Sequence, residues 1–173
     1  MTKSIDQVSH TRLLEELHIK SSAIDSAVNG IAFGDLETRI TYANAAALKI
    51  LGGYTLEEVI GLSVLTFAYS QEEAALIFTE FWEKGSWSGE VAIRKKDGSR
   101  IVVHLSASIV LGKDGEPVST LCSFIDITRT RQAFEELRLK DHAIASSVTG
   151  MVFGDLEARV TYANAAAHEL FGG

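Results

Sequence analysis

The chain has 173 residues, of which 46% are hydrophobic and 23% charged, so it can bury a core and is not a disordered tail. Its 16 basic and 23 acidic side chains give a formal net charge of −7, which argues against nucleic acid as a partner. The single cysteine, Cys122, excludes an internal disulfide, and no thiols or imidazoles have zinc-site spacing. Neither a membrane-spanning run nor a signal-peptide pattern occurs, so we expect a cytoplasmic location.

The most informative feature of the sequence is an internal repeat. Residues 17–53 recur as residues 137–173, an offset of 120 positions, and 22 of the 37 aligned residues are identical. This offset suits whole domains better than solenoid repeats of about 20 to 50 residues. Because the second copy stops partway, we expect one complete unit followed by the first third of a second.

The first unit opens with a predicted amphipathic helix near residues 9–28. Four apolar residues share one helical stripe there: Leu14, Leu17, Ile24 and Val28. Two short runs, residues 31–36 and 39–43, then flank a polar corner, as the strands of a hairpin do. Asn44 is placed to cap a short helix over residues 45–51.

The rest of the first unit is predicted to contain helices followed by three strands. Capping-box spacing predicts helices that begin after Thr55 and after Ser70, the second running to about residue 84. Three strands separated by glycine turns follow, over residues 87–95, 100–111 and 118–127. Two strands, then helices, then three strands predict an α+β domain with a five-stranded antiparallel sheet and helices packed on one face.

Four separate motifs occur in a fixed order along this unit: Asp35 to Ala47, Gly52 to Gly61, Trp87 to Ser99, and Asp126-Ile127-Thr128. Together they resemble the PAS domain, the small sensory module of signalling proteins, over about residues 22–128. Residues 137–173 look like the first third of a second such domain. We therefore expect a lead-in helix in residues 1–28, a PAS domain in 29–128, a linker (signalling) helix in 129–148 and a truncated second PAS domain in 149–173.

In this family the sheet and its helices enclose a pocket for a cofactor or small ligand, so the resemblance implies a pocket here. Strand alternation and the helix stripe give eight candidates for its wall: Phe33 (or its neighbour Ile31), Ile77, Phe81, Val103, Leu105, Thr120, Cys122 and Phe124. The same residues would also make a filled core, and both interpretations remain open. His104 is expected on the opposite, outer face of the sheet, near a helix or subunit contact, with a ligand role as the alternative.

Other residues have expected roles that are structural or concern signalling. Asn44 is a helix cap, and Trp87 is most simply a large packing residue, although in the family this region can also touch a ligand. The resemblance implies that Asp126, Ile127 and Thr128 form the junction where the last strand passes a signal into an exit helix.

The resemblance also allows two known cofactors of the family to be tested. Photochemical flavin sensors use a cysteine on a helix after the second strand, whereas Cys122 lies on the last strand, and Phe124 replaces the glutamine they need. Haem-binding members supply a histidine from the helix before the third strand, and residues 71–84 contain none. The sequence argues against both cofactors and leaves the ligand unknown.

The segment after the last strand reads as one amphipathic helix with a heptad pattern. Its predicted coiled-coil seam consists of Phe134, Leu137, Ile144 and Val148, with Asp141 among them. We expect a homodimer through the flanking helices or through the half second domain. The alternative is a linker helix that folds back onto its own sheet.

Catalysis has little support in the sequence, which lacks a glycine-rich phosphate loop, a helical metal-ligand pair and an evident nucleophile with its base. The first hypothesis is a non-catalytic sensory module that relays its state to an output domain of a sensor histidine kinase, or of a cyclic-dinucleotide enzyme. The second is a ligand-free dimerisation or spacer module in a protein with several PAS domains.

Overall fold

The computed structural model describes residues 2–172, with side chains from Thr11 onward. The chain forms two compact units that meet between Ile127 and Thr128. Within the described residues, no helix combines the length and the apolar character that crossing a membrane requires.

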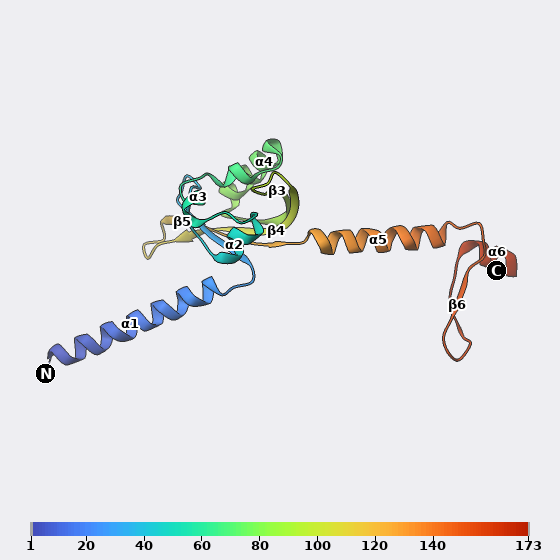
Figure 1. The fold of residues 1–173 in the computed structure, drawn as a ribbon, viewed down its shortest axis with the longest axis horizontal. Coiled ribbons are helices and arrows are strands. Elements are labelled where there is room, and N and C mark those ends of the chain that lie inside the picture. Colours follow the sequence, from blue (N-terminus) through green and yellow to red (C-terminus); the bar gives the residue numbers. More distant parts are fainter. Residues whose placement is uncertain (1, 173) are drawn as a thin grey trace. The chain divides into compact units, whose positions relative to one another are not determined.

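The first unit places helix α1 (Thr2–Asp25) before a mixed sequence of strands and short helices (Figure 1). These are β1 (Gly30–Gly34), β2 (Ile40–Ala43), α2 (Ala45–Ile50), α3 (Leu56–Val59), the 3-10 helix η1 (Val64–Phe67), α4 (Gln71–Lys84), β3 (Ser86–Arg94), β4 (Arg100–Leu111) and β5 (Pro117–Asp126). The strands form one antiparallel sheet in the order β2-β1-β5-β4-β3. The predicted five-stranded α+β fold is confirmed.

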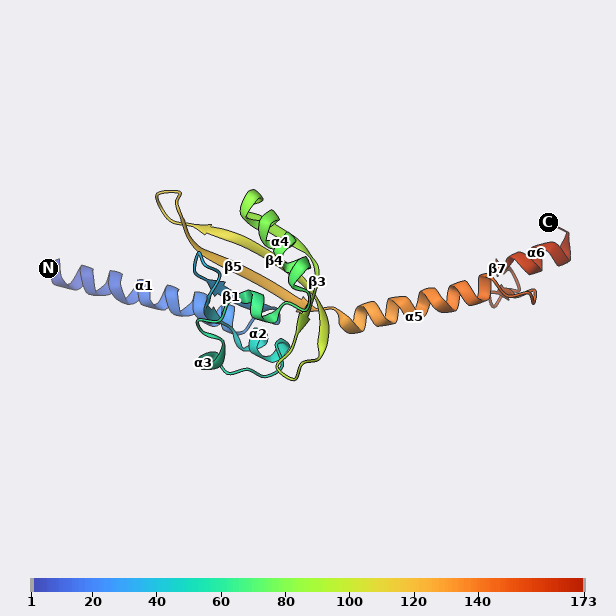
Figure 2. The same cartoon turned by 90° about the horizontal axis from the view of Figure 1, so that it is seen from above.

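The core of this unit lies between one face of the sheet and the helices that connect β2 to β3 (Figure 2). The sheet contributes Val103 from β4 and Phe124 from β5, both buried. Leu51 after α2, Val59 of α3 and Phe67 of η1 close over them. Burial of these side chains supplies the main driving force for packing the helices on the sheet.

The turn between β1 and β2 has a close counterpart in the second copy of the repeat, where Asp155 accepts the Arg159 amide. Asp35 accepts a hydrogen bond from the Arg39 amide at 2.8 Å, and Thr38 has φ of 58°. At the equivalent position of the second unit, Ala158 has φ of 61°. The left-handed region costs a residue with a β-carbon about 1 kcal/mol, so both hairpins keep the same locally strained turn.

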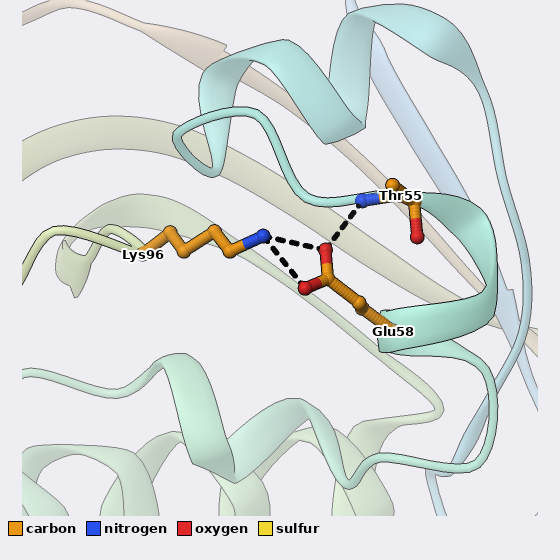
Figure 3. Close-up of polar contacts among 3 residues, drawn as sticks. All are labelled: Thr55, Glu58 and Lys96. Atoms are coloured by element: carbon orange, nitrogen blue, oxygen red, sulfur yellow. Dashed lines mark hydrogen bonds and ion pairs between the residues drawn. The ribbon is translucent and has the colours of Figure 1, made fainter.

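An ion pair joins α3 to the distant turn between β3 and β4 (Figure 3). Glu58 accepts the Thr55 amide at 2.8 Å, which completes the capping box, and its two carboxylate oxygens lie 2.7 and 2.6 Å from Lys96 Nζ. The Lys96 amide also donates to the carbonyl of Leu51 at 2.9 Å. Exposed ion pairs contribute little by themselves, so the backbone bond to Leu51 is the firmer tie of this turn to the helical segment, while the capping box holds Glu58 in place for Lys96.

The second unit contains α5 (Thr128–Ala145), β6 (Val152–Gly154), β7 (Val160–Ala163) and α6 (Ala165–Phe171). Two helices end earlier than the sequence predicts: α1 at Asp25 and α5 at Ala145. Val28 and Val148, expected on the helical stripes, therefore lie beyond the helix ends and are 84% and 97% exposed. Each helix ends just before a serine, Ser26 or Ser146, whose hydroxyl donates to a backbone carbonyl of the last turn, and the apolar pattern continues beyond that point.

Candidate functional site

The first unit contains a cavity of about 160 Å³ between the inner face of the sheet and the helices that cover it. Side chains from all five strands, from η1 and α4 and from Leu51 after α2 contribute to its wall. They are Ala32, Thr38, Ile40, Ala43, Leu51, Val64, Leu65, Phe67, Ala68, Ala74, Ile77, Phe78, Phe81, Trp87, Val91, Ile93, Val103, Leu105, Ala107, Thr120, Cys122 and Phe124. None of these described residues carries a formal charge.

The structure places seven of the eight candidate residues around this cavity: Ile77, Phe81, Val103, Leu105, Thr120, Cys122 and Phe124. The assignment of Phe33, with Ile31 as its alternative, is wrong. In β1 the inward position belongs to Ala32, which pairs with Ala43 and Cys122 across the sheet. Side chains alternate along a strand, so Phe33 points outward, where its ring packs against Tyr42. Whether the seven residues bind a ligand stays a prediction.

The largest omission from the predicted wall is the segment around η1. Ser63 caps this short helix by accepting the Leu65 amide at 3.3 Å, and Leu65 and Phe67 then face the cavity. The one available signal was a serine before the mostly apolar segment Val64 to Ala68, which is too short to show helical periodicity. Trp87 also lines the cavity, and its indole N–H donates to Glu80 at 3.0 Å.

The titratable groups near the sheet differ in their surroundings. Burial raises the pKa of the Cys122 thiol to about 11, so the thiol is protonated near neutral pH. His104 is exposed on the outer face, as the alternation of β4 predicts. Among the described residues, no group of three or more His, Cys, Asp or Glu side chains is arranged to hold a metal ion.

Asn44 connects the end of α1 to the sheet and to α2. Its side-chain oxygen accepts the amides of Ile31 and Ala47, each at 2.9 Å, and its amide nitrogen donates to the carbonyls of Ile24 and Asn29 at 2.9 and 3.0 Å. The Asn44 side chain is buried, so its own polar atoms depend on these four bonds in place of water. Sequence reasoning assigned only the cap of α2, and we call the complete set of four bonds the Asn44 latch.

One strand of the cavity wall, β5, lies beside the segment that follows α1 and ends just before α5. On β5, Phe124 packs its ring over Gly30, close to the Asn44 latch. The strand ends at Asp126 and α5 begins at Thr128, with Ile127 between them. The Ile127 amide donates to the carbonyl of Val102 at 2.9 Å, which fixes the junction to β4.

The second unit repeats the latch at the end of α5. Asn164 accepts the amides of Met151 and Ala167 at 2.8 and 3.0 Å, and donates to the carbonyls of Ile144 and Thr149 at 3.0 Å each. Beside it lies an apolar hollow of about 420 Å³, lined by Val152, Val160, Ala163, Ala167, His168 and Phe171. These positions correspond to inner-face residues of the first unit.

Comparisons with known proteins agree with this architecture. Two family models, both described as PAS domain, match residues 28–129 and residues 128–172. A solved PAS domain of a protein from Colwellia psychrerythraea superposes with a TM-score of 0.59 at 23% identity, covering 65% of this chain and 98% of that one.

Two curated relatives are longer than this chain. The C4-dicarboxylate transport sensor protein DctS of Rhodobacter capsulatus is 25% identical over 169 residues, which are 95% of this chain and 25% of the relative. The probable diguanylate cyclase DgcE of Escherichia coli is 27% identical over 128 residues, which are 71% of this chain and 11% of the relative. The chain thus spans a quarter or less of each of these relatives.

Proposed function

The chain belongs to the PAS domain family, with one complete domain and part of a second, and on that premise we propose that it is a ligand-sensing module. A small ligand binds in the cavity of the first unit, and its presence is relayed through α5 to an output domain of the parent protein. The relatives are a sensor protein and a probable cyclic-dinucleotide enzyme. We favour the output domain of a sensor histidine kinase.

One observation supports this proposal most strongly, namely the position of β5. Three of its residues, Thr120, Cys122 and Phe124, face the cavity, and the same strand ends two residues before α5 begins. A ligand that shifts this strand therefore acts on the junction at Ile127 without an intervening loop. Packed elements respond to such shifts as whole bodies, which is how a small change at a wall becomes a movement of a helix.

The name of one relative refers to C4-dicarboxylate, but the cavity does not support transferring that ligand to this chain. A dicarboxylate needs basic side chains or several free donors, and none of the described residues in the wall is charged. We therefore do not propose a C4-dicarboxylate as the ligand of this chain.

A second function, a ligand-free dimerisation module, is favoured by a different observation. Phe134 and Leu137 of α5 are 62% and 59% exposed, and they lie on the predicted heptad seam. Two such helices in parallel would cover these side chains, as in a coiled coil.

Native mass spectrometry combined with hydrogen exchange separates the two functions. Protein purified from the cells that produce it should carry a stoichiometric compound, and extraction of that compound should change amide exchange at Ile127 and in the first turn of α5. An empty protein through repeated preparations, with a dimer as its main species, would instead support the spacer function.

A further inference from the structure

The chemistry of the cavity wall restricts the ligand more narrowly than family membership does. Apart from two threonines, one tryptophan and a protonated thiol, every side chain in the wall is hydrocarbon. Resting on the sensory function proposed above, we propose that the cavity binds an uncharged, largely apolar molecule of about the size of benzene.

The few polar groups of the wall are already engaged with the protein. The hydroxyl of Thr38 donates to the carbonyl of Glu37 at 2.7 Å, and that of Thr120 donates to the carbonyl of Asp35 at 3.4 Å. The indole N–H of Trp87 donates to the carboxylate of Glu80. No buried side-chain N or O atom among the described residues lacks a partner. A polar ligand would therefore lose its hydrogen bonds to water and find few donors to replace them.

The energetic cost is far larger for an ion. A carboxylate or ammonium group placed in an apolar cavity without a partner is expelled or neutralised, because its desolvation is not compensated. The thiol of Cys122 shows the same effect of this environment, since burial raises its pKa and keeps it neutral. The wall thus selects against charged ligands whatever their shape.

Size supplies the second restriction. Apolar cavities of about 150 Å³ stay dry and admit benzene. The cavity here measures about 160 Å³, so it accommodates an aromatic ring or a short branched hydrocarbon. Because an apolar wall offers water few hydrogen bonds, filling the cavity gains dispersion contacts that the empty wall lacks.

The test uses residues 1–173 with 13C-labelled methyl groups, titrated separately with benzene and with sodium succinate. Benzene should produce saturable shifts of the methyl signals of Ile77, Val103 and Leu105, while succinate should leave them unchanged. In the variant Ala107→Leu, which adds bulk to the wall, benzene should bind at least about tenfold more weakly. The adjacent exposed Ser106→Leu variant is the matched control and should bind benzene as the wild type does.

The outcomes separate this inference from the sensory function. Shifts with succinate and none with benzene would overturn the ligand class while leaving ligand sensing intact. The absence of a shift with either compound would also overturn the proposed ligand class. A charged compound that copurifies with the protein would in that case still support ligand sensing. If Ala107→Leu fails to fold, Cys122→Ile fills the same cavity from β5, and the wild-type comparison of the two compounds remains decisive.

Discussion

The ring of Phe124 lies so close over Gly30 that a β-carbon at position 30 would stand 2.7 Å from ring atom Cε2. The backbone of Ala47 lies 3.0 Å from the same point, so the glycine is enclosed on two sides. Phe124 also lines the cavity of the first unit, and Gly30 follows Asn29, whose carbonyl belongs to the Asn44 latch. Phe124 therefore stands between the cavity and the start of β1, next to the segment that follows α1.

Replacing Gly30 with alanine should force this ring to move. Overpacking of this kind typically costs about 1 to 3 kcal/mol, and we expect the Gly30→Ala variant to lose about that much free energy of unfolding in chemical denaturation. The displaced ring should also occupy part of the cavity and weaken benzene binding.

A double variant provides the control for this prediction. Phe124→Leu removes the ring, so Gly30→Ala combined with it should be less destabilised than the two single changes predict, with a coupling of at least about 1 kcal/mol. Strictly additive effects would show that the ring does not restrict position 30.

The sequence predicted the elements better than it predicted which side chains meet. Glycine turns and capping boxes are local signals, so the three-strand meander and the starts of α3 and α4 could be found without the fold. The inward face of β1 could not be predicted from the sequence, because hydrophobicity favours Phe33 over Ala32 as the buried residue. The face is fixed by the pairing with β5, which places Gly30 under the ring of Phe124 and Ala32 opposite Cys122. The hydrogen bonds from Asn44 to Ile24 and Asn29 likewise depend on where α1 ends, which no local sequence pattern predicts.

Changing Asn44 to aspartate should separate the hydrogen bonds that this side chain accepts from those that it donates. The oxygen that accepts the Ala47 amide is kept, whereas the two bonds donated to Ile24 and Asn29 become unfavourable contacts between oxygen atoms. We expect hydrogen exchange to accelerate at least about tenfold in the last turn of α1, while the start of α2 stays protected.

Two comparisons make this result interpretable. Asn44→Ala should expose both segments to exchange, because it also removes the cap of α2. Asn164→Asp should loosen the last turn of α5 in the same manner without affecting α1. Equal exchange of α1 in the wild type and in Asn44→Asp would contradict the role given to the latch.

Cys122 should make the protein less stable in alkali. Its pKa is raised from 9.0 to about 11 in the folded state, so between these values the unfolded chain holds fewer protons. The free energy of unfolding then falls as pH rises, by at most roughly 2 kcal/mol between pH 9 and 10.5. Below about pH 8 the thiol is protonated in both states and contributes no pH dependence.

The variant Cys122→Ala isolates this effect. Urea denaturation at pH 8 and at pH 10.5 should show a smaller loss of stability for the variant than for the wild type, whatever its stability at pH 8. An identical loss in both proteins would assign the alkaline instability to other groups.

The exposed seam of α5 should join two copies of the chain. Phe134→Glu combined with Leu137→Glu places two like charges on each helix at the predicted contact, and in a parallel dimer these charges face their counterparts. We expect sedimentation equilibrium to show a dimer for the wild type and a monomer for this double variant. Leu139→Glu is the matched control, because Leu139 is also exposed on α5 but lies off the seam. If Leu139→Glu dissociates the dimer as effectively, the contact is not a heptad seam, and if the double variant sediments as the wild type does, α5 does not join the copies.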